Sequence, residues 1–329
     1  MSNLKLTHAD MITHLESKGV TFEYISKTEA LEILKTKNYF FKLKCYKANF
    51  DKNANDNYKN LDFGMLVDLS NIDTRIRKFI LSATLNIEHF LKAKLLKLIT
   101  DDQTEDGYTI VQEFITHYNT IIDAQAVADG VPLIKYKSKK ISVNKLWGYA
   151  KDSENTTTHQ LYQSYGANPP IWVILEIISF KHLVKFAEFY KSEKSTNVDQ
   201  SLENVINNMM FVKFIRNAAA HNSPLIRNMK QRNVYGSTNE VEQFVSSLPN
   251  VNRKDKANLK NDAINSFVTT LYVFHLLIPS KEMKEYTYID LLDLLERIER
   301  NKEYYVRIHP EIVSIYKFIR TVSEEIIKL

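Results

Sequence analysis

A long stretch of helical periodicity, residues 63 to about 98, constrains the fold of this chain most strongly. Apolar residues recur there every three or four positions, which places them on one face of an α-helix. The chain has only 7 glycines and 7 prolines among its 329 residues, so few positions interrupt helices. We therefore predict an all-α fold with one long helix, although the pattern allows a break near Ser70. The stripe consists of Leu66, Leu69, Ile72, Ile76, Phe79, Ile80, Ala83, Ile87, Phe90 and Leu91.

Shorter helical patterns lie on both sides of this stretch. We expect a helical segment over residues 1–60 and one compact helical domain over 61–329, with polar insertions near 126–168 and 236–262. Pro224 is expected to end the helix before it, because a residue that precedes proline disfavours the α conformation. The other expected helices cover residues 7–19, a stretch from Ser26 or Thr28, 108–125, 171–190, 202–222, 263–278, 286–300 and 310–328.

Composition limits the class of protein. The single cysteine, Cys45, excludes an internal disulfide and a cysteine-based zinc site, and we expect it to be a buried structural thiol. The N-terminal sequence has no uninterrupted apolar run of the signal-peptide type. The most apolar stretch, residues 170–183, is too short and too charged to span a bilayer. We expect a cytoplasmic protein with no membrane partner, no cofactor and no bound metal.

Arg216 and His221 form the pattern that most indicates chemistry. Cleavage of RNA by its own 2′-hydroxyl needs a base for the hydroxyl proton, an acid for the leaving 5′-oxygen and positive charge against the phosphorane. Histidine titrates in the range that suits the proton transfers. Arginine supplies a permanent, forked charge that matches phosphate oxygens. This chemistry requires no metal.

The spacing of this pair is weak support by itself, since a chain of this composition is expected to contain it about once by chance. Five residues also turn the two side chains about 140° apart on an ideal helix, so they converge only where the helix ends or distorts. The alternative is a structural helix-end histidine with an exposed arginine. Asn217 and the three alanines that follow it favour the functional interpretation.

Five segments, spread in order over residues 6 to 277, resemble the Abi-like family of the AbiD/AbiF type. Their order is more specific than any one of them. The sequence departs from the family pattern at Lys92, Lys181 and Pro224, where an arginine, a glycine and a basic residue are usual. The segments are HLESKGV, EALEILKTKNYFFKLKCYKANF, LVDLSNIDTRIRKFILSATLNIEHFLKAKL, PPIWVILEIISFKHLVKF and IRNAAAHN.

The resemblance implies a HEPN-like helical bundle, a role in phage defence, and RNA as substrate or partner, in some members with a structured small RNA as a restraint. His221 is then the base or acid, Arg216 stabilises the phosphate, and Asn217 holds the geometry. One histidine is half of an acid–base pair, so we expect a homodimer that brings two copies of His221 together.

Several further residues receive roles from the same resemblance. Glu88 is expected to orient Arg216 or His221, and the alternative is a solvent-facing ion pair with Lys92. Arg77 or Arg75 is expected to pair with Glu88 or to contact RNA, and Asp73 is a similar candidate. The candidate RNA contacts are Asn222, Arg227, Lys230 and Arg232 after the motif, and Lys137, Lys139 and Lys140 in a lysine-rich segment, although basic clusters are more often solvated faces.

Two sets of aromatic residues could stack on bases, but we expect core packing for both: Trp147 with Trp172, and Tyr39 with Phe40. Glu176 lies among apolar residues, so we expect it to be buried in a structural ion pair. Three functions stay open at this point. They are a metal-independent endoribonuclease that acts as an abortive-infection effector, a non-catalytic RNA-binding regulator, and a protein–protein adaptor.

Overall fold

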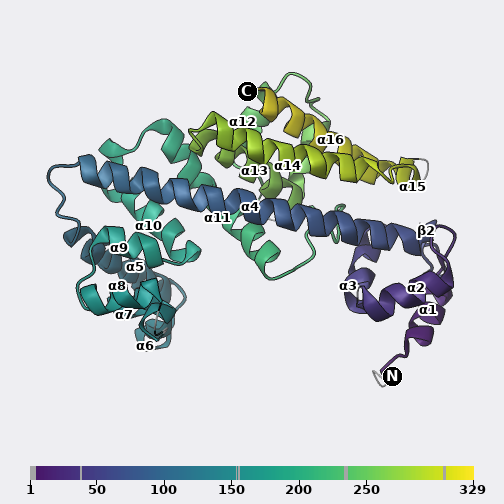
Figure 1. Cartoon of the computed structure of the whole chain (residues 1–329), viewed down its shortest axis with the longest axis horizontal. Helices are drawn as coiled ribbons and strands as arrows, with labels where there is room; N and C mark the ends of the chain where they lie inside the picture. The colour runs from purple at the N-terminus through teal and green to yellow at the C-terminus, as the bar shows by residue number, and fades with distance from the viewer. Residues whose placement is uncertain (1–4, 38, 153, 155, 233–235, 307–308) are drawn as a thin grey trace. The chain divides into compact units, whose positions relative to one another are not determined.

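The computed structural model contains sixteen α-helices and two strands of two residues each in the part of the chain that it describes, so the all-α prediction is confirmed (Figure 1). The described residues are 5–37, 39–152, 154, 156–232, 236–306 and 309–329. The chain forms two compact units. Unit 1 comprises residues 1–85 and 214–329, and unit 2 comprises residues 86–213. The expected helical segment 1–60 lies within unit 1.

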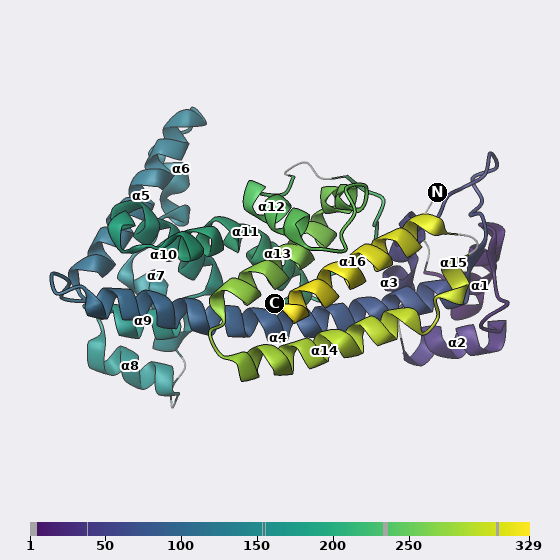
Figure 2. The same cartoon turned by 90° about the horizontal axis from the view of Figure 1, so that it is seen from above.

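The predicted long helix is α4, Phe63–Asp101, and it runs without a break at Ser70 (Figures 1 and 2). Its apolar stripe is buried, as the periodicity predicts: Leu66, Leu69 and Ile72 have no exposed surface. At its start, the buried carboxylate of Asp62 accepts a hydrogen bond from the backbone N–H of Gly64 at 2.7 Å. Asp62 thereby satisfies one of the amide groups that a helix N-terminus leaves unpaired.

The N-terminal part of unit 1 is a set of short elements near the start of α4 (Figure 1). Helices α1, His8–Ser17, and α2, Lys27–Thr36, lie where helices were expected, and they begin with capping boxes at Thr7 and Ser26. Strand β1, Val20–Thr21, pairs in parallel with β2, Leu61–Asp62. Helix α3, Phe40–Cys45, continues into the 3-10 helix η1, Tyr46–Asn49.

The C-terminal part of unit 1 is a group of helices that lies along the first part of α4 (Figures 1 and 2). The carboxylate of Asp68 on α4 accepts hydrogen bonds from Arg297 at 2.6 Å and Tyr305 at 2.9 Å, and all three side chains are buried or nearly so. This network joins two distant parts of the sequence. The elements are α12, Asn239–Ser247; η5, Asp255–Lys260; α13, Asp262–Leu277; α14, Lys281–Glu299; α15, Glu303–Val306; and α16, Pro310–Lys328.

Unit 2 contains a pair of longer helices and a run of short ones. Helix α5, Thr109–Ala128, packs on α10, Phe180–Glu193, through Phe114, Phe186 and Phe189. The segment 126–168, expected to be irregular, holds α6, Leu133–Tyr136; η2, Lys137–Lys139; α7, Val143–Trp147; η3, Gly148–Lys151; and α8, Thr157–Tyr165.

The single helix expected over 171–190 is wrong. Helix α9, Ile171–Ile177, ends at an extended Ile178, and α10 begins anew because the Ser179 hydroxyl accepts a hydrogen bond from the backbone N–H of His182. The apolar pattern continues across this break, since Ile178 and Phe180 are both buried. The capping hydrogen bond at Ser179 therefore starts a new helix, although the hydrophobic pattern is uninterrupted.

Two expectations about burial in α9 are also wrong. Glu176 is exposed rather than buried. Trp172 is 45% exposed, and its ring lies so close to Gly107 that it leaves no space for a side chain there. Trp147 is 1% exposed and lies in the core of unit 2, as expected. None of the described helices is both long enough and apolar enough to cross a membrane.

Candidate active site at the end of α11

Helix α11, Gln200–Ala220, ends at the predicted motif. The backbone N–H of Ser223 donates to the carbonyl of Ala218 at 2.8 Å, and that of Asn222 donates to Ala219 at 3.1 Å. Asn222 has a φ of +55°. These bonds form a Schellman motif with asparagine at the left-handed position, and Pro224 follows directly. The helix therefore ends where the sequence predicts, through Asn222 rather than through the proline alone.

This helix end positions the three predicted catalytic residues differently. His221 is exposed in the terminal turn, whereas Arg216 and Asn217 are half-buried. The Arg216 guanidinium donates a hydrogen bond to the Asn217 side-chain oxygen at 3.2 Å. Asn217 also fixes the backbone of the motif, since its carbonyl accepts from the N–H of His221 at 2.9 Å. Asn217 thus contacts both ends of the Arg–His pair.

Lys42 of α3 also binds to the turn at the end of α11. Its ammonium group donates to the Asn222 side-chain oxygen at 2.7 Å, and its side chain is almost completely buried. Burial lowers the pKa of Lys42 below its usual value, and the charge of Arg77 adds to this effect. Asn222 is therefore fixed by its side chain as well as by its backbone, and its contact with RNA stays a prediction.

Two buried polar side chains fix the chain that follows the turn. The carboxylate of Asp73 on α4 accepts from the backbone N–H groups of Leu225 at 2.7 Å and Ile226 at 3.0 Å. Asn49 of η1 donates to the carbonyls of Ile226 at 2.9 Å and Arg227 at 3.1 Å. Asn49 also accepts from the N–H of Met229 at 2.7 Å. These bonds supply partners for backbone N–H and C=O groups of an irregular segment, which would otherwise be buried without hydrogen bonds.

Asp73 and Arg77 pair with each other rather than with Glu88. The two side chains form a buried ion pair one helical turn apart, and Arg77 also donates to the Thr74 hydroxyl at 2.9 Å. Asp73 therefore supports the segment after His221, while Arg77 balances its charge.

A sequence profile of the family described as Abi-like protein matches residues 32–227 of the chain. This match covers more than half of the chain. The chain belongs to the Abi-like family. Its membership associates it with abortive infection, a defence of bacteria against phage. No curated protein and no protein of known structure matches the chain.

The matched part of this Abi-like protein begins within α2 and ends at Arg227, so it contains Lys42, Asn49, Asp73 and the whole motif. Lys42 and Asn49 were not identified as site residues from the sequence. Both lie in the segment EALEILKTKNYFFKLKCYKANF, which resembles the family, and this position was the available signal.

The basic residues after the motif of the Abi-like protein have different surroundings. Arg227 is exposed beside the motif turn. Lys230 instead forms ion pairs with Asp51 at 2.9 Å and Glu311 at 3.2 Å. Arg232 donates to the carbonyl of Ala257 at 2.8 Å. Of the three, Arg227 is best placed to meet a ligand.

The other predicted site residues of the Abi-like protein lie in unit 2. Glu88 forms an ion pair with Lys92 at 3.0 Å, the partner named in the alternative interpretation, and the pair is half-buried. Lys140 pairs with Asp123 at 2.6 Å. Lys139 lies 3.4 Å from the centre of the Tyr136 ring, and Lys137 is exposed. Their contribution to RNA binding stays a prediction.

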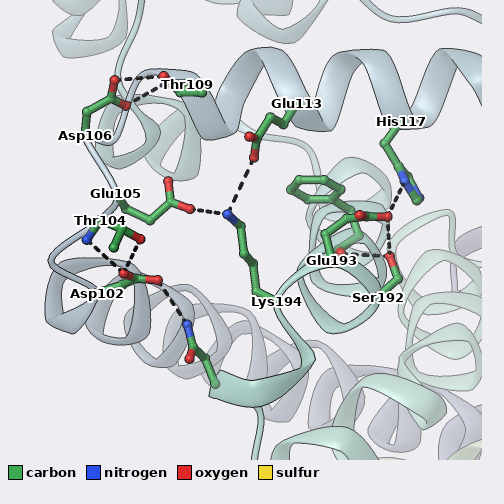
Figure 3. Close-up of polar contacts among 12 residues, drawn as sticks. Asp102, Thr104, Glu105, Asp106, Thr109, Glu113, His117, Ser192, Glu193 and Lys194 are labelled. Carbon is green, nitrogen blue, oxygen red and sulfur yellow. Dashed lines mark hydrogen bonds and ion pairs between the residues drawn. The ribbon is translucent and has the colours of Figure 1, made fainter.

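A second polar cluster of the Abi-like protein lies between α5 and the end of α10, beside a cleft of about 520 Å³ (Figure 3). His117 contacts Glu193 at 3.1 Å, and Lys194 contacts Glu105 at 2.5 Å and Glu113 at 3.8 Å. These contacts join three chain segments and place three carboxylates around one lysine and one histidine. Among the described residues, no group of three or more His, Cys, Asp and Glu side chains is placed to hold a metal ion.

Proposed function

We propose that this Abi-like protein is an abortive-infection effector that cleaves RNA without a metal ion, with the end of α11 as its active site. The observation that carries this proposal is the exposed His221 in a hydrogen-bonded turn: the carbonyls of Asn217 and Ala218 accept bonds from the turn, and Lys42 binds Asn222. A preorganised turn with an exposed imidazole is what proton transfer to a bound ligand needs.

The reaction is an internal transesterification of RNA. His221 accepts the proton of a 2′-hydroxyl, and the resulting oxygen attacks the adjacent phosphorus. The bond from phosphorus to the 5′-oxygen breaks, and that oxygen takes a proton from an acid. The products are a 2′,3′-cyclic phosphate and a 5′-hydroxyl end. Arg216 stabilises the negative charge on the phosphorane, and its bond to Asn217 sets the direction of its guanidinium.

A second copy of the chain supplies the missing acid in this proposal. One motif provides a single imidazole, whereas the reaction needs a base and an acid at the same phosphate. A two-fold axis near the end of α11 brings two copies of His221 and Arg216 together. We therefore propose a homodimer as the active form, with RNA as substrate and a structured small RNA as a restraint on activity.

The test is RNA cleavage in the presence of EDTA by the purified wild-type protein, by His221→Ala and by His8→Ala. His8 is an exposed histidine at the start of α1 and provides a matched control. We expect cleavage by the wild type and His8→Ala and a loss of at least about a hundredfold in His221→Ala. Equal cleavage by all three proteins would contradict the proposal.

Toxicity on expression extends the test to a protein that is restrained by bound RNA. The wild type is expected to slow bacterial growth when the restraint is absent, and His221→Ala is not. If neither protein is toxic or cleaves RNA, and intact RNA co-purifies with both, the non-catalytic RNA-binding regulator is the better description.

A further inference from the structure

Two exposed aromatic rings lie at the start of α3. Tyr39 is 59% exposed and Phe41 is 78% exposed, which corrects the expectation that Tyr39 packs in the core. Phe40 between them is half-buried, with its ring edge-on to His14 at 6.1 Å. Burial of a phenylalanine side chain stabilises a fold. The fold does not gain this stabilisation from Phe41.

The helix that carries the two rings is bonded to the proposed active site. Lys42, directly after Phe41, is the residue that fixes α3 to the motif turn through Asn222. Asn49 of η1, which continues α3, donates to the carbonyls of Ile226 and Arg227. The segment formed by α3 and η1 is therefore bonded both to the motif turn and to the segment that follows it.

The charge around the rings fits a polyanion. No acidic residue occurs between Glu32 and Asp51, and three lysines of this stretch are exposed, Lys35, Lys37 and Lys44. Lys44 is exposed on α3, and its ammonium group lies 5.8 Å from the centre of the Phe40 ring. Exposed aromatic rings among cations are the combination that binds unpaired nucleotides, because bases stack on the rings while cations attract the phosphates.

We propose that Tyr39 and Phe41 form a base-stacking subsite that positions unpaired RNA at the end of α11. As a subsite for the substrate, it rests on the proposed function. Stacking needs a base with a free face, so the subsite selects single-stranded or looped RNA over a duplex, whose bases stack on one another. Phosphates next to the stacked bases then lie near Arg227 and the motif turn.

The experiment measures binding in the His221→Ala protein, which keeps RNA intact. The probe is a short oligoadenylate in which one adenine is replaced by fluorescent 2-aminopurine. Stacking on a protein ring is expected to quench this fluorescence. Phe41→Leu and Tyr39→Ala are each expected to weaken binding at least about fivefold and to reduce the quenching. Tyr39→Phe, which keeps the ring, is expected to bind like the parent protein.

Tyr286→Ala is the matched control, because Tyr286 is 74% exposed on α14 and has no place in the subsite. Equal affinity of Phe41→Leu, Tyr39→Ala and Tyr286→Ala would overturn the proposal. So would a loss of dimer in Phe41→Leu with unchanged RNA affinity, since the rings would then contact protein. Failure of the nuclease proposal is separate: the wild type would bind and quench the probe without cleaving it.

Discussion

Two of the ion pairs on helix α4 place an acidic residue four positions before a basic one, Asp73–Arg77 in unit 1 and Glu88–Lys92 in unit 2. The Asp73 carboxylate is fully buried, and it also accepts two backbone hydrogen bonds from the segment after His221. The side chains of Glu88 and Lys92 are 17% and 22% exposed, so water can solvate this pair in part. The same pattern on one helix therefore supports a distant loop in one unit and serves as a local helix contact in the other.

Removal of Asp73 is expected to have the largest effect. Asp73→Ala leaves Arg77 buried without its counter-charge and two backbone N–H groups without their acceptor. We expect a loss of about 3–5 kcal/mol in the free energy of unfolding, measured by urea unfolding with circular dichroism. A loss below about 1 kcal/mol, which is typical of exposed ion pairs, would mean that the buried pair stabilises the fold no more than the Glu88–Lys92 pair does.

The comparison extends to Asn49 in unit 1 and Asn119 in unit 2. The side chains of both asparagines hydrogen-bond to the backbone of irregular segments. Asn119 in unit 2 donates to and accepts from the backbone of Ile141, both at 2.9 Å. Each alanine variant is expected to lose about 1–3 kcal/mol of stability. Under conditions where both variants are folded, RNA cleavage is expected to fall only in Asn49→Ala. An equal fall in Asn119→Ala would show that stability alone governs activity.

The sequence predicted the elements that local patterns determine. Periodicity identified α4, and Thr7 and Ser26 marked the starts of α1 and α2. The site was predicted only in part. The Lys42–Asn222 bond joins residues 180 positions apart, and no local pattern encodes such a contact. The break at Ser179 was missed because the apolar pattern continues across it.

Lys47, two residues before Asn49, gives a pH-dependent test of burial in unit 1. Burial lowers its pKa to about 8 from 10.5, helped by Lys44, Lys52 and Lys18. Between these two pH values the unfolded chain keeps a proton that the folded chain has released, so the contribution of Lys47 to stability rises with pH. Lys47→Met is expected to be more stable than the wild type at neutral pH by about 3 kcal/mol.

This advantage of Lys47→Met is expected to shrink as the pH approaches 10.5. The measurement is the difference in unfolding free energy between the two proteins at several pH values. A difference that does not change with pH would mean that Lys47 has its ordinary pKa and that η1 does not bury its charge.

The smallest effect is expected at the second pair. Glu88→Gln removes a half-buried charge that has a partner one turn away, and we expect a loss of about 0.3–1 kcal/mol. RNA cleavage is expected to match that of the wild type, because the Glu88 carboxylate has its ion-pair partner, Lys92, within unit 2. A large fall in cleavage with intact stability would instead support the predicted role of Glu88 in orienting Arg216 or His221.

The central claim is that His221 at the end of α11 transfers protons during attack by a 2′-hydroxyl. The most direct test is the chemical identity of the RNA ends, determined by mass spectrometry after incubation in EDTA. The wild type is expected to produce 2′,3′-cyclic phosphate and 5′-hydroxyl ends, and His221→Ala is not. Ends with a 3′-hydroxyl and a 5′-phosphate, or the cyclic ends from His221→Ala at the wild-type rate, would contradict the account.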